Sequence, residues 1–150
     1  MNEISLLNSW LLEHFNNNVL VNTISTVKTL EMDFNKENIY PLFNLDIKTS
    51  DILNDVIIVE YTITILQQRD DRPIKIDSKL LENTNYIDNI NETHSIAQRL
   101  INVLSKQNNT SNIEIQELST LRFLKNYSAS NCDGVQFDIN LSTPNIGSSC

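Results

Sequence analysis

The longest regular pattern in the chain runs from Asp55 to Pro73 and reads DVIIVEYTITILQQRDDRP. Every second position from Ile57 to Ile65 is apolar or aromatic, and the positions between them are mostly polar. This alternation predicts a half-buried antiparallel strand of about a dozen residues, roughly 40 Å long at ~3.3 Å per residue. A short turn, SDILND, separates it from the alternating run 39–49. We expect these two runs to form a hairpin, with the C-terminal strand on the other flank.

Two segments show the period of an amphipathic helix. Residues 3–16 place their apolar side chains on one stripe, with Asn2 as the N-cap. Residues 90–106 do the same, and Asn89 followed by Glu92 resembles a capping box. The stripes are Ile4, Leu7, Leu11 and Phe15, widened by Trp10 and Leu12, in the first helix, and Ile96, Ala97, Leu100, Val103 and Leu104 in the second.

Further strands are predicted on both sides of the second helix. Residues 19–32 are rich in β-branched types and predict one bent strand or two short ones. Residues 113–126 predict another strand, and 135–144 show the clearest alternation of all. The order is helix, strands, helix, strands. It predicts one α+β domain over residues 1–150, a two-layer sandwich with a mainly antiparallel sheet and two helices packed on one face.

Composition and charge narrow the class of protein. The chain has 150 residues, 40% of them hydrophobic, which is enough for one core. Its net charge of -8 argues against tight binding of nucleic acid. Cys132 and Cys150 are predicted to be free thiols. The sequence shows no signal peptide and no apolar run of transmembrane length, so we expect a product made in the cytosol with no membrane partner.

The chain has few residues of the types and spacings used in catalysis, metal binding or cofactor binding. His14 and His94 have no cysteine or carboxylate at ligand spacing on the same face, so no metal site is predicted. The two glycines, Gly134 and Gly147, are too few for a P-loop or a dinucleotide fingerprint. We read the stretch around Cys132 as a tight turn. No catalytic residue and no cofactor is predicted, although a site assembled from distant residues stays open.

The segment 69–90 is polar and long for a loop in a compact domain. It begins with the densest charge cluster of the chain, Arg-Asp-Asp-Arg at 69–72. One interpretation is a solvated loop tip. The other is a docking element, since charges of mixed sign suit complementary contacts with a neighbouring copy. Apolar residues within the segment need a surface to pack on, in this domain or in another subunit.

The order of elements and three segments resemble a known group of proteins. The segments are NKENIYPLFNLDI (35–47), VIIVEYTITILQQRDD (56–71) and GVQFDINLSTP (134–144), with the helix HSIAQRLINVLSK (94–106) before the last. They are similar to neck or tail-completion proteins of crAss-like tailed phages, and more broadly to the tail-terminator and head-tail joining family. The similarity covers nearly the whole chain, through structural motifs. The last strand begins Gly134-Val135, where the family pattern has Gly-Trp.

The resemblance implies a structural virion protein without enzymatic activity, located in the neck or tail and made in the host cytoplasm. It implies a connector or tail-terminator ring of about six or twelve copies. The ring would contact portal or adaptor proteins and tail ring proteins, and genomic DNA would pass through it without specific binding. In such a ring, 69–90 would lie at an interface between subunits or between stacked rings. The interface candidates are Arg69, Asp70, Asp71, Arg72, Lys75 and Tyr86.

Two other functions stay open at this point. A tail-tube or baseplate subunit would also be an acidic, β-rich ring former. A small phage-encoded protein that binds a host factor belongs to a different class, and it would act as a monomer absent from particles.

Overall fold

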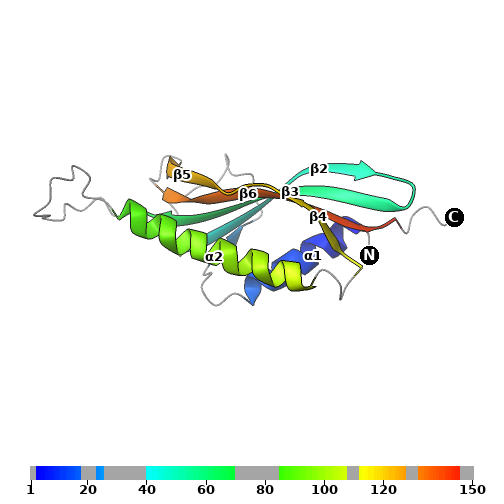
Figure 1. Cartoon of the computed structure of the whole chain (residues 1–150), viewed down its shortest axis with the longest axis horizontal. Helices are drawn as coiled ribbons and strands as arrows, with labels where there is room; N and C mark the ends of the chain where they lie inside the picture. The colour runs from blue at the N-terminus through cyan, green and yellow to red at the C-terminus, as the bar shows by residue number, and fades with distance from the viewer. Residues whose placement is uncertain are drawn as a thin grey trace, which may run out of the picture.

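The computed structural model describes residues 3–17, 23–25, 40–69, 85–107, 112–127 and 132–145. These residues form two helices and one sheet (Figure 1). In chain order the elements are α1 (Glu3–Asn16), β1 (Thr23–Ser25), β2 (Leu42–Ile52), β3 (Val56–Gln68), α2 (Tyr86–Gln107), β4 (Glu114–Leu118), β5 (Arg122–Tyr127) and β6 (Cys132–Pro144).

The sheet is mostly antiparallel and is built around β3. Its order is β1-β2-β3-β6-β4, and β5 also pairs with β6. β4 pairs with the second half of β6 and β5 with its first half, so the two short strands share one flank of β6. Among the described strands, only the pairing of β1 with β2 is parallel. The long hairpin of β2 and β3 and the pairing of β3 with the C-terminal strand are both confirmed.

Both helices cover the same face of the sheet, which confirms the predicted α+β two-layer architecture (Figure 1). The core lies between them and the alternating apolar side chains of β3 and β6. Leu7, Leu11 and Phe15 of α1 are fully buried, and the Phe15 ring lies 4.6 Å from that of Phe43. Burying each such side chain contributes about 1.5–3 kcal/mol, so this stripe is what holds α1 on the sheet.

Several predicted boundaries are wrong, each for a local reason. β2 continues to Ile52, so the turn is Leu53 to Asp55 and not the whole SDILND stretch. The predicted strand 113–126 is two strands, separated by Ser119 to Leu121. The residues Cys132 to Gly134 begin β6 and do not form a turn. Of the predicted strand 19–32, the described part is β1.

The second helix starts four residues before the predicted segment 90–106, at Tyr86. Asn85 precedes the first turn, where its carbonyl accepts the backbone N–H of Asn89 at 2.9 Å. The predicted capping box at Asn89 and Glu92 is therefore wrong. Asn89 lies inside α2, is buried, and has side-chain contacts that a cap would not make.

Gly134 allows β3 and β6 to approach closely where β6 begins. A Cβ atom at this position would overlap the backbone carbonyl oxygen of Ile65 on β3. Because that atom is backbone, no rotamer change relieves the overlap. The glycine is thus required for strand packing and not for a turn.

Candidate functional site

The β2–β3 hairpin extends past the ends of both helices (Figure 1). On β2, the side chains from Ile47 onward lose the cover that buries the start of the strand. Ile47 is 43% exposed, Ile52 75% and Leu53 51%. Asp51 and Asp55 flank these apolar residues and are exposed too. We call Asp51, Ile52, Leu53 and Asp55 the hairpin tip.

The hairpin tip is held in place by hydrogen bonds from the end of the sheet. The Leu53 N–H donates to the Val56 carbonyl at 2.9 Å, which closes the turn. After β6, the side-chain amide of Asn145 donates to the Leu53 carbonyl at 3.0 Å, and its backbone N–H donates to the Asp55 carbonyl at 3.0 Å. The exposed apolar side chains therefore stand on a preorganised backbone, which lowers the entropy cost of binding.

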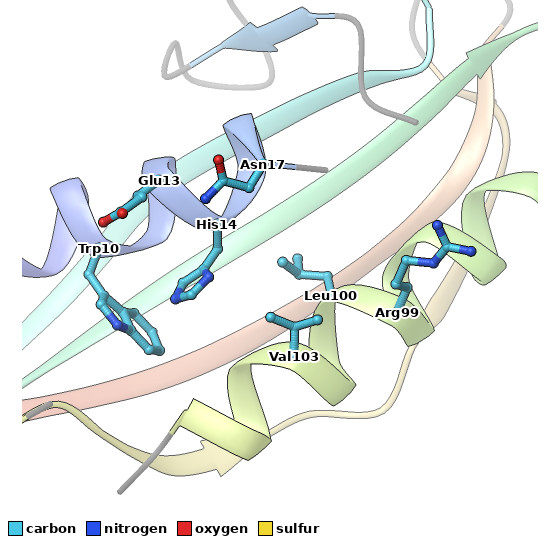
Figure 2. Close-up of a pocket in the computed structure, with 7 residues that line it drawn as sticks. All are labelled: Trp10, Glu13, His14, Asn17, Arg99, Leu100 and Val103. Carbon is cyan, nitrogen blue, oxygen red and sulfur yellow. The ribbon is translucent and has the colours of Figure 1, made fainter. Parts of the chain in front are cut away.

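A pocket of about 280 Å³ lies between the helices (Figure 2). We call it the interhelix pocket. Trp10 and His14 point into it from α1, and Leu100 and Val103 face them from α2. Its remaining lining residues are Glu13, Asn17 and Arg99. Its volume lies just below the usual ~300–1,000 Å³ of small-molecule sites.

The pocket walls differ in charge. The rings of His14 and Trp10 pack edge to face, with their centroids 4.8 Å apart and their planes at 85°. Partial burial lowers the pKa of His14, although the Glu13 carboxylate opposes the shift. Arg99 stands on the α2 wall, where a second hollow of about 420 Å³ continues past Val103 to Lys106. The α2 wall is thus basic and the α1 wall carries Glu13.

The first interface candidate, Arg69, is engaged in a buried ion pair within the chain. Its guanidinium donates to both carboxylate oxygens of Asp133, at 2.6 and 3.0 Å. The exposed fraction of the side chain is 7% for Arg69 and 0% for Asp133. The amide of Asn89 completes the cluster, donating to Asp133 at 3.2 Å and to the Gln68 carbonyl at 3.1 Å. This cluster fixes the end of β3 to β6 and α2.

Tyr86 lies beside the same cluster, between two cations. The Arg69 guanidinium carbon is 5.5 Å from the ring centroid and the Lys125 ammonium nitrogen is 4.9 Å away. The structure thus brings Arg69 and Tyr86 together, at the two ends of the polar segment. The other candidates, Asp70, Asp71, Arg72 and Lys75, lie outside the described residues, as does Cys150.

The face of the sheet opposite the helices carries a small apolar cluster at one end, around Leu42, Leu66 and Cys132, and polar side chains further along. Asp138 accepts hydrogen bonds there from Thr62 at 2.7 Å and from Arg122 at 3.0 Å. Burial alone would raise the pKa of Asp138, but these two donors outweigh it and the pKa is lowered. Among the described residues, no group of three or more histidines, cysteines and carboxylates is placed to hold a metal ion. Cys132 is buried, and its thiol lies 3.3 Å from the Tyr40 hydroxyl.

No protein-family model matches the chain, and no curated protein matches its sequence. Among the described helices, none is long and apolar enough to cross a membrane.

The sequence did not point to the hairpin tip or to the interhelix pocket. A signal for the tip was present: Ile52 and Leu53 are two large apolar residues among the polar ones of SDILND. The pocket had no such signal, because Trp10 and Val103 look like ordinary members of apolar helix stripes.

Proposed function

We propose that this chain is a structural virion protein, the subunit of a head-to-tail connector or tail-terminator ring through which genomic DNA passes. The observation that supports it most is the hairpin tip. A rigid, apolar, exposed projection is an aggregation hazard in a free monomer, and it is useful where another subunit covers it.

A ring accounts for where the projection lies. The tip is at one end of the sheet and the interhelix pocket opens between the helices, so the two are different surfaces. Contacts between unlike surfaces are head-to-tail, and they form a ring when the rotation between subunits closes. A symmetric dimer would instead use one surface twice.

Charge also fits this role. A net charge of -8 on 150 residues keeps a channel wall from adhering to phosphates. The polar part of the sheet face opposite the helices, with Asp138 and its neighbours, offers hydrogen bonds without a large positive field. The family resemblance described above points in the same direction.

The test is the copy number of this protein in purified phage particles, measured by quantitative mass spectrometry. We expect about six or twelve copies per particle, the number that the family resemblance implies for a closed ring. A much larger number would place the chain in the tail tube or shell. Absence from particles would refute the proposal and favour a protein that binds a host factor.

A further inference from the structure

We infer that the hairpin tip of one copy inserts into the interhelix pocket of the next copy. The inference rests on the proposed ring assembly and names the two surfaces that would build it. It is carried by the shape, the apolar character and the charge of residues that the structure describes.

The hairpin tip and the interhelix pocket match in shape and in apolar character. The tip is convex, and its most exposed side chains are Ile52 at 75% and Leu53 at 51%. The pocket is a hollow of about 280 Å³ whose floor combines Trp10, Leu100 and Val103. A space several times the ~30 Å³ share of one liquid water suits an aliphatic side chain. Ile52 is 75% exposed in its own chain, so it is available to the pocket of another copy.

Charge complementarity sets the orientation. Asp51 and Asp55 flank the tip, and Arg99 with Lys106 line the α2 wall of the pocket and its continuation. Basic residues are the minority, 11 against 19 acidic ones, so two on one wall form a distinctive feature. Glu13 on the α1 wall would repel the same aspartates. The tip therefore enters with its carboxylates toward α2.

Another exposed apolar surface is a weaker receptor. Phe123 is 58% exposed and Ile87 63%, near the start of α2. The Phe123 ring lies 6.2 Å from that of His94 with the two planes tilted by 37°, and Phe123 lines none of the pockets described above. A convex tip gains less contact on such a surface than in a pocket, so we place the docking site between the helices.

The experiment is photo-crosslinking from the tip, with Leu53 replaced by a benzophenone amino acid in the full chain. Mixing isotope-labelled and unlabelled protein separates crosslinks between copies from those within one copy. We expect crosslinks between copies to map to 10–17 and 99–106. The control places the same amino acid at Leu118, a 39% exposed residue on β4, and should not label the pocket.

Charge exchange tests the orientation independently. Asp55→Lys and Arg99→Glu should each lower the crosslinking yield about two- to five-fold, as expected for an exposed ion pair. The double variant, which carries both changes in every chain, should restore the yield. Val103→Glu adds bulk and a like charge inside the pocket and should lower the yield at least about ten-fold.

The outcomes separate this inference from the proposed function. Crosslinks that map to Phe123 or elsewhere, in a protein present at ring stoichiometry, would overturn the pairing and leave the ring. An absence of crosslinks between copies within assembled particles would overturn it too. Crosslinks in the pocket for a protein absent from particles would support the pairing and refute the virion role.

Discussion

The buried ion pair between Arg69 and Asp133 gives the sharpest test of what holds the end of β3. Arg69→Met keeps the length of the stem and removes the charge. The variant takes the guanidinium away from the Asp133 carboxylate, which is 0% exposed and also accepts a hydrogen bond from the amide of Asn89. Removing one partner of a buried pair costs about 3–5 kcal/mol, because the other charge stays in a medium of low polarity.

Urea unfolding monitored by circular dichroism measures this cost. With a slope of about 2 kcal/mol per molar for a small domain, a loss of ~4 kcal/mol lowers the midpoint by ~2 M. Adding Asp133→Asn to Arg69→Met removes both charges and keeps an amide oxygen for Asn89. The double variant should recover most of the loss, since a neutral pair no longer buries an unpaired charge.

The matched control is Arg122→Met, which breaks a similar contact in a different environment. Arg122 and Asp138 are 3.0 Å apart, and their side chains are 44% and 30% exposed. Water screens that pair, so its loss should cost about 1 kcal/mol or less. If Arg69→Met shifts the midpoint no more than Arg122→Met does, burial does not govern these pairs and the argument fails.

Three further predictions concern other parts of the core. Gly134→Ala should destabilise the fold by about 1–3 kcal/mol or more in urea unfolding, because β6 must move away from the Ile65 carbonyl. Tyr61→Phe should leave stability unchanged or raise it by up to about 1–2 kcal/mol, since the buried Tyr61 hydroxyl has no hydrogen-bond partner among the described residues. The folded protein holds the pKa of His14 below its usual value, so on acidification the unfolded chain binds a proton at this residue before the folded chain does. The melting temperature should therefore fall as the pH drops below about 6.5. His14→Gln should flatten this pH dependence.

The periodic parts of the fold were predictable from the sequence. α1 matches the predicted span 3–16, and β3 and β6 alternate as expected because each buries one face under the helices. The predicted buried stripes of the two helices include residues that are exposed: Ile4 and Val103 are each 38% exposed. Ile4 lies in the first turn of α1 and Val103 faces the interhelix pocket, and an apolar period cannot show where the partner surface stops.

Non-periodic features escaped prediction because they depend on contacts distant in sequence. Arg69 was interpreted from its charged neighbours as part of an exposed tip. Its actual partner, Asp133, is 64 residues away in sequence. Asn89 resembled a cap in its local context, yet the same distant carboxylate draws it into the interior. Local sequence shows which residues are polar, and only the folded sheet shows which polar residues meet.

The small free energy gained by burying the hairpin tip implies that the proposed ring would assemble on a ring already in place. Burying Ile52 and Leu53 contributes at most about 1.5–3 kcal/mol each, and both are already partly covered. Association costs an estimated 4–15 kcal/mol in lost translation and rotation, so a single tip-to-pocket contact leaves little net affinity. In a closed ring every subunit makes the contact twice, and a neighbouring ring already in place raises the effective concentration of subunits. In the proposed ring, an apolar tip too small to pair free subunits would still suffice to close the ring where subunits are gathered.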